Sequence, residues 1–374
     1  MTPAGIALAG PNARGLLSAP RAVLNQAVKQ RAFPGAAWGA LHNGSIVALD
    51  ALGRFTYEPD APAVSPETLF DLASVTKVIA TTATAMLLVD RGLLDLDARL
   101  GDILPGFVIG MAPGSGKERV TLRMLLAHSS GMVGWAPLFR NSGTPDALLR
   151  AILQLPLESS PGTRTEYSDF GFILLGKVIE LLTRTPLDVF CAREIFAPLG
   201  LAHTRFCPRR ADCPVIPPTE EDRAFRGRVI QGEVQDEHAF VLGGVAGHAG
   251  VFSNVEDLLR FAQCILERGR TAGGVQLFRP ETVDLFTERK TTPDGRSRAL
   301  GWDVPTEPSS SGHFFGPRSI GHLGYAGTSL WIDPDQNLAV ALLTNRTWPD
   351  RSTETIRQLR PAFHDAVVGS LRTA

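Results

Sequence analysis

Cysteine and lysine are both scarce in this chain of 374 residues, which holds four cysteines and five lysines. No C-x-x-C pair occurs, and no spacing of Cys and His residues suits a zinc ion. We therefore expect no metal site, and nothing in the sequence implies a cofactor. The net charge is −1, and the Lys and Arg residues are scattered rather than clustered. This charge pattern predicts no binding of nucleic acid.

Long apolar runs are also missing, because no run approaches the ~18 residues that a membrane-spanning helix needs. We therefore predict no membrane span. Residues 1–10 lack a basic segment, and their apolar part is too short for a secretory signal peptide. We expect a cytoplasmic protein, with a periplasmic or secreted location as the open alternative. The sequence also leaves the oligomeric state open.

The order of the predicted elements favours an α+β fold in one domain, residues 1–374. Asn43-Gly44 separates two apolar segments, and Asn-Gly is the strongest short signal for a β-hairpin. Strand patterns are found at 36–42, 45–52, 298–304, 319–324, 329–333 and 338–345. Turn residues separate the last three, as in an antiparallel meander. The middle of the chain is mostly helical, and residues 353–372 are predicted to be helical with a break at Pro361.

These elements predict a sheet built from both ends of the chain, flanked by the first and last helices. An α/β subdomain would comprise residues 1–80 and 205–374. A mostly helical subdomain, 81–204, would be inserted between its two parts.

Ser74 and Lys77 stand three residues apart, next to an apolar, helix-forming run from Val78 to Val89. If a helix begins near Ser74, the two side chains share one face, and the Lys77 amine lies beside the Ser74 hydroxyl. A neighbouring base is what turns a weak serine hydroxyl into a nucleophile. Twenty serines and five lysines in 374 positions give about a quarter of a match by chance, so the motif needs support from elsewhere.

Two further stretches could supply that support. Tyr167 and Asp169 precede a predicted helix, where both can point into a cleft and the phenol can move a proton beside a lysine. The alternative is that Asp169 only caps the helix. Gly321-His-Leu-Gly324 lies in the meander, where a strand glycine often marks the close approach of a ligand. His322 could there meet an anionic group or simply be a hydrogen-bonded residue of the sheet.

A glycine-rich run, Gly243 to Gly250, is interpreted as a tight backbone crossing beside the site. Its His248 could face the site or be tied to backbone carbonyls. Asp236, a little earlier in the chain, could line the cleft or lie in a solvated loop. Ala127-His-Ser-Ser-Gly131 is interpreted as structural.

Ser-x-x-Lys, Tyr-x-Asp and His-x-Gly in this order resemble the serine β-lactamase and penicillin-binding protein superfamily, especially class C β-lactamases, D,D-peptidases and related esterases. The resemblance covers nearly the whole chain and implies a β-lactamase/transpeptidase-like fold. It implies that Ser74 is the acylated nucleophile and that Lys77 and Tyr167 share the general acid and base work. The oxyanion hole would be formed by the backbone N–H groups of Ser74 and Tyr325, with Gly324 beside the substrate.

The chain departs from class C β-lactamases at two positions. Those enzymes carry Asn where Asp169 stands, and a carboxylate beside Lys77 favours the ammonium form, which shifts base work toward Tyr167. They also carry Lys-Thr-Gly where His322-Leu-Gly324 stands. We expect His322 to be partly charged near neutral pH. It should therefore bind a substrate carboxylate more weakly than that lysine does, and in a pH-dependent way.

A narrower branch fits better. Residues 167–176, the run 243–250 and Leu343-Thr-Asn-Arg346 look like those of exo-acting N-acetylmuramoyl-L-alanine amidases, although that branch usually carries His where Gln235 stands. The resemblance implies a muropeptide or another small-molecule substrate, bound near Asp236, His248 and Arg346. Arg346 suits a substrate carboxylate or lactyl oxygen, and its alternative is a surface salt bridge.

Three alternatives to a muramoyl amide stay open. D-alanyl peptides, esters and β-lactams are possible substrates of the same chemistry. A promiscuous carboxylesterase or a weak class C-like β-lactamase would act on the last two. A sensor that binds penicillin or muropeptides without catalysis belongs to another functional class.

Overall fold

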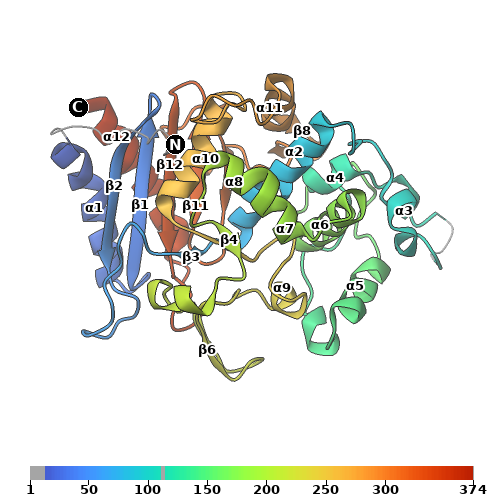
Figure 1. Ribbon diagram of the computed structural model, residues 1–374, viewed down its shortest axis with the longest axis horizontal. Coiled ribbons are helices and arrows are strands. Elements are labelled where there is room, and N and C mark those ends of the chain that lie inside the picture. Colours follow the sequence, from blue (N-terminus) through green and yellow to red (C-terminus); the bar gives the residue numbers. More distant parts are fainter. Residues whose placement is uncertain (1–12, 111–113, 374) are drawn as a thin grey trace.

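Five strands form an antiparallel sheet in the computed structural model, which describes residues 13–110 and 114–373 (Figure 1). Their order is β10-β11-β12-β1-β2. The strands are β1 (Gly35–His42), β2 (Ser45–Gly53), β10 (Ile320–Leu323), β11 (Ser329–Asp333) and β12 (Leu338–Thr344). The predicted hairpin and the C-terminal meander are confirmed, and β12 pairs with β1, which joins the two ends of the chain. Residues 1–10, on which the expectation of location depends, lie outside the described part.

The predicted strand at 298–304 is wrong. Only β9 (Ser297–Arg298) pairs there, with β8 (Lys290–Thr291), and Asp303 makes a single bridge to Gly321. Gly301 has a positive φ of 85° and turns the chain between these pairings.

Helices cover both faces of the sheet. The first helix, α1 (Ala13–Lys29), and the last, α12 (Ile356–Thr373), lie together on one face, where Trp38 meets Phe363 edge-on at 5.4 Å (Figure 1). The opposite face packs against α10 (Val255–Leu266). The predicted break at Pro361 is wrong, because α12 continues through it. A proline there removes one helical hydrogen bond, while buried Leu359 and Phe363 on either side hold the helix against the core.

Helices also dominate residues 83–199, which lie on the far side of the molecule from α1 and α12 (Figure 1). They are α2 (Ala83–Asp90), α3 (Leu100–Ile103), α4 (Leu122–Leu126), α5 (Pro145–Gln154), α6 (Asp169–Thr183), α7 (Leu187–Cys191) and α8 (Ala197–Leu199). The remaining elements are β3 (Phe70–Asp71), β4 (Arg205–Phe206), β5 (Glu220–Asp222), β6 (Arg228–Ile230), α9 (Glu237–Val241), β7 (Val251–Ser253) and α11 (Pro280–Thr287). The subdomain boundaries at 80 and 204 stay a prediction.

One continuous helical segment, Ala73–Asp90, connects the two halves. It begins with a 3₁₀ turn, Ala73–Val75, widens into π-helical turns over Lys77–Thr82 and ends as α2 before Gly92, whose φ is 67°. The predicted helix with a glycine after its end is confirmed.

The prediction that no apolar run approaches the length of a membrane-spanning helix needs correction. The 18 residues of this segment are long and apolar enough to cross a membrane. However, 83% of it is buried inside the protein, and core helices of soluble proteins pass the same test. This is weak evidence for a span.

Candidate active site

The nucleophile candidate, Ser74, lies at the start of the central segment, in a turn that the buried Asp71 carboxylate holds. Ala73 has a positive φ of 48°, a strained value for a residue with a side chain. The buried carboxylate of Asp71 accepts hydrogen bonds from the backbone N–H of Ala73 and of Gln235, both at 2.8 Å. Burial raises the pKa of Asp71 to about 6. Asp71 thus ties the strained turn to a distant loop, a role that the sequence did not reveal.

Lys77 is fully buried and reaches the serine. Its Nζ donates to Ser74 Oγ at 3.0 Å, to Asp169 Oδ1 at 2.7 Å and to the backbone oxygen of His248 at 3.2 Å. Burial acts to lower the pKa of Lys77, but the charge of Asp169 and the phenol of Tyr167 outweigh it, so the pKa is raised. Lys77 is therefore an ammonium group at neutral pH, as the carboxylate at position 169 led us to expect.

Tyr167 and Asp169 come from the start of α6, where Ser168 caps the helix by accepting the N–H of Gly171 at 3.2 Å. Asp169 is therefore not the cap, and its carboxylate forms the ion pair with Lys77. Burial raises the pKa of Tyr167 to about 12, although interactions of its hydroxyl with Lys77 and Ser74 act in the opposite direction. The phenol is protonated at neutral pH and stands beside both groups.

His128 supports Tyr167 from behind. Its ring lies 4.6 Å from the Tyr167 ring, and its Nδ1 accepts the backbone N–H of Ser168 at 3.0 Å. Burial places the pKa of His128 well below its usual value, so the imidazole is neutral. Residues 127–131 are predicted to be structural, and no pattern in the sequence indicates this contact with Tyr167.

The glycine-rich run is a tight crossing, as predicted. A Cβ on Gly247 would lie 2.0 Å from the backbone oxygen of Phe172 in α6. The expected place of His248 beside the substrate needs correction, because its side chain is buried and donates from Nε2 to Asp236 Oδ1 at 2.8 Å. Asp236 does line the cavity and caps α9, and although its burial acts to raise the pKa, His248 holds the pKa below its usual range.

Strand β10 and the turn after it form the opposite wall. Gly324 is needed there, because a Cβ would lie 1.9 Å from Thr328 Oγ1 and 2.5 Å from the backbone oxygen of Leu72. The backbone N–H of Tyr325 has no hydrogen-bond partner in the described part of the chain, which leaves it available to an oxyanion. His322 is 1% exposed, and burial lowers its pKa to about 4. The expectation of a partly charged His322 is therefore wrong.

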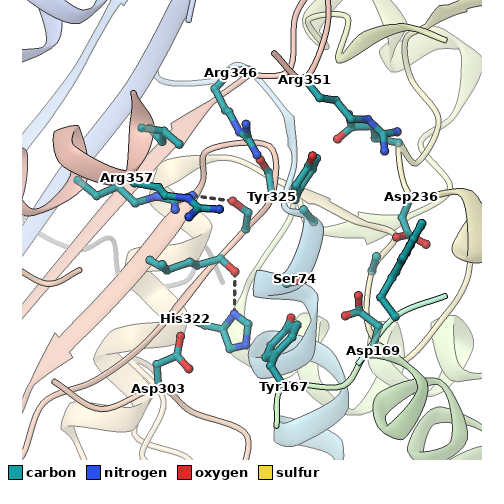
Figure 2. A pocket seen from close by; sticks show the side chains of 18 of the residues that line it. Ser74, Tyr167, Asp169, Asp236, Asp303, His322, Tyr325, Arg346, Arg351 and Arg357 are labelled. Carbon is teal, nitrogen blue, oxygen red and sulfur yellow. Dashed lines mark hydrogen bonds between the residues drawn. The ribbon is translucent and has the colours of Figure 1, made fainter. Parts of the chain in front are cut away.

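One cavity of about 670 Å³ brings the predicted site residues together (Figure 2). It is lined by Ser74, Tyr167, Asp169, Asp236, His322 and Tyr325. Arg346 lines it too and is not a surface salt bridge, because it donates to the backbone oxygens of Tyr325 at 2.7 Å and Thr353 at 2.8 Å. Sequence reasoning missed further lining residues, namely Trp135, Glu237, Arg298, Asp303, Arg351, Glu354, Arg357 and Arg360. They come from segments without a recognisable motif.

No cluster of three or more His, Cys, Asp or Glu side chains that could hold a metal ion occurs among the described residues.

A family model for beta-lactamases matches residues 21–362 of the chain. The protein belongs to the beta-lactamase family. It is 35% identical to the N-acetylmuramyl-L-alanine amidase of Bacillus subtilis (strain 168), over 84% of this chain and 77% of that protein. It is 34% identical to an Escherichia coli (strain K12) protein that carries the provisional name D-alanyl-D-alanine carboxypeptidase, over 83% of this chain and 74% of that protein.

A solved structure of EstCE1, a hydrolase with promiscuous acyltransferase activity, superposes with a TM-score of 0.76 at 22% identity and covers 95% of this chain and 99% of that one. At this identity the likeness concerns the fold, which confirms the β-lactamase/transpeptidase-like architecture. This beta-lactamase family member is a hydrolase, as its relatives are.

Proposed function

We propose that this beta-lactamase family hydrolase forms an acyl-enzyme on Ser74 and cleaves the amide between a muramoyl lactyl group and its peptide. Ser74 Oγ bonds to the carbonyl carbon, the C–N bond breaks, and the amine leaves with the proton that Ser74 gives up. Water then attacks the ester and returns a proton to Ser74. The observation that carries this proposal is the contact of the buried Lys77 ammonium with both Ser74 Oγ and Asp169.

The charges of the site favour Tyr167 as the proton carrier. Lys77 is held as an ammonium by Asp169, so its role is to stabilise the oxyanion that develops on Ser74. Neutral Tyr167 can accept the serine proton while it passes its own proton to the leaving nitrogen, which requires no ionised phenol. General-base catalysis by Lys77 is the alternative, and it would require the Lys77 ammonium to lose the proton that Asp169 stabilises.

The backbone N–H groups of Ser74 and Tyr325 would bind the carbonyl oxygen as it becomes negative. Removal of one such donor typically costs roughly 3–4 kcal/mol of activation free energy. The Gly324 backbone fixes the position of Tyr325, because its N–H donates to Thr328 at 2.7 Å and its oxygen accepts from Arg360 at 2.6 Å.

A muropeptide fits the remaining walls of the cavity. The guanidinium groups of Arg346, Arg351 and Arg357 line the cavity (Figure 2) and suit the carboxylates of a peptide stem, which would compete with Glu237 for Arg351 and with Glu354 for Arg357. Trp135 is half exposed at the cavity and offers an apolar face to a sugar ring. The amidase name of the Bacillus subtilis relative supports the same choice of bond.

Active-site labelling combined with a muramoyl-peptide assay tests this proposal. A fluorophosphonate should label wild type and the surface variant Ser160→Ala equally, but not Ser74→Ala. Mass spectrometry should detect release of the peptide from N-acetylmuramoyl-peptides, again only with Ser74 present. Active protein without an adduct on Ser74 would overturn the nucleophile assignment.

The rival functions give different patterns in the same experiment. A carboxylesterase would hydrolyse short p-nitrophenyl esters and leave muramoyl-peptides intact, and a weak β-lactamase would turn over a fluorescent penicillin. A sensor would bind muropeptides tightly without releasing product from either class of substrate.

A further inference from the structure

The side chain of His322 carries a buried nitrogen that has no hydrogen-bond partner in the described part of the chain. Nδ1 lies 2.8 Å from the backbone oxygen of Leu323, and because a carbonyl only accepts, Nδ1 must carry the hydrogen. Nε2 makes no hydrogen bond to any described residue, although it is shielded from solvent. The neutral ring therefore carries its hydrogen on Nδ1, and Nε2 is the nitrogen without a hydrogen-bond partner.

Nε2 is a hydrogen-bond acceptor rather than a donor. Burial lowers the pKa of His322 to about 4, and the charges of Lys77 and Arg298 act in the same direction, against the opposing charge of Asp303. The imidazole is therefore neutral, and its Nε2 holds a free lone pair. Burying an acceptor away from water costs free energy unless a donor forms a hydrogen bond with it. Since His322 lines the catalytic cavity, a ligand in that cavity can supply the donor.

The position of His322 indicates which part of the substrate it meets. Its ring lies 6.0 Å from that of Tyr167, on the side of the cavity formed by β10 (Figure 2). Under the function proposed above, Tyr167 delivers the proton to the leaving nitrogen. The imidazole next to it therefore lies on the side of the leaving group.

We propose that Nε2 of His322 accepts a hydrogen bond from the N–H of the leaving amine, so that the site favours amides over esters of the same acyl group. In the tetrahedral intermediate, the leaving nitrogen keeps its own hydrogen, which donates to Nε2, and takes a second hydrogen from Tyr167 as the C–N bond breaks. An ester oxygen has no hydrogen, so its lone pairs would face the lone pair of Nε2. The inference rests on the acyl-serine function and adds a specificity residue to it.

A matched pair of substrates measures this effect directly. N-acetylmuramoyl-L-alanine is compared with the isostere in which L-lactate replaces L-alanine, so that an ester oxygen replaces the amide N–H. The ratio of the two kcat/KM values cancels the intrinsic reactivity of each bond when wild type and variants are compared. His322→Leu should lower the amide-to-ester ratio about tenfold, the effect of one neutral hydrogen bond. His322→Gln, whose amide oxygen can accept in place of Nε2, should recover most of the ratio.

Two results would overturn the assignment. If amide and ester kcat/KM fall in parallel in His322→Leu, the residue has only a structural role. If neither value falls, no substrate donor reaches the residue. Thermal unfolding and fluorophosphonate labelling of Ser74 establish that each variant is folded, and His322→Phe, which also lacks an acceptor, carries the comparison if His322→Leu does not fold. Absence of Ser74-dependent turnover of both substrates by wild type would instead refute the proposed function itself.

Discussion

Replacement of Asp169 by Asn tests the charge state of the buried ion pair at the centre of the site. Lys77 Nζ lies 2.7 Å from Asp169 Oδ1, and the two side chains are 0% and 17% exposed. Removing one partner of a buried pair typically costs 3–5 kcal/mol. The Asn amide oxygen can still accept from Nζ, so we expect Asp169→Asn to lower the free energy of unfolding by about 2–3 kcal/mol at pH 7.

The cost should depend on pH with a defined sign. In wild type the pKa of Lys77 is raised above its ordinary value of 10.5, so the pair contributes stability that is complete below that pH and is lost as the pH rises through the raised pKa. In Asp169→Asn burial dominates and the pKa of Lys77 falls below 10.5. The folded variant then binds fewer protons than its unfolded chain, and its stability rises with pH in that window. The difference between the two proteins should therefore shrink as the pH approaches 10.5.

Urea unfolding of both proteins from pH 7 to pH 10.5 measures this difference. Asp97→Asn is the control, because Asp97 pairs with Arg123 at the surface, where the side chains are 65% and 39% exposed. We expect that control to change the free energy of unfolding by no more than about 0.5 kcal/mol. An effect of Asp169→Asn that matches the control and stays constant with pH would refute the ammonium–carboxylate pair.

Two other variants test the proton path and the backbone crossing. Tyr167→Phe should lower kcat by about 10²–10⁴-fold in Ser74-dependent turnover and leave the thermal midpoint nearly unchanged, because the ring still contacts His128; activity within tenfold of wild type would contradict the relay. Gly247→Ala should lower the free energy of unfolding by more than about 2 kcal/mol, since its Cβ would overlap the Phe172 oxygen. Gly143→Ala, with no atom within 4 Å, is the matched control, and equal stability of the two variants would show that the crossing is not tight.

Local patterns predicted the parts of the fold that depend on near neighbours in sequence. Asn43-Gly44 indicated the hairpin, and the spacing of Ser74 and Lys77 placed both groups on one helical face, as their 3.0 Å contact confirms. The same kind of pattern failed at 298–304, where Gly301 turns an apolar segment, and at Pro361, where packing outweighs one lost hydrogen bond.

The support of the site could not be predicted, because it comes from remote segments. Asp71 binds the backbone of Gln235, which is 164 residues away, and His128 binds that of Ser168, which is 40 residues away. His248 was predicted to bind substrate, but its buried side chain is bonded to Asp236 and is not among the residues that line the cavity.

The sequence by itself determined which chemical groups the protein has and the order in which the chain presents them, because motif spacing and turn residues act over a few positions. The tertiary structure alone decided the charge of His322, whereas the ammonium form of Lys77 was already expected from a carboxylate at position 169. Lys77 is held as an ammonium by a carboxylate 92 residues away, and His322 is neutral because distant segments exclude water from it. The charge state of a group depends on its burial and on the charges around it, to which every neighbouring segment contributes. These segments come together only in the folded chain.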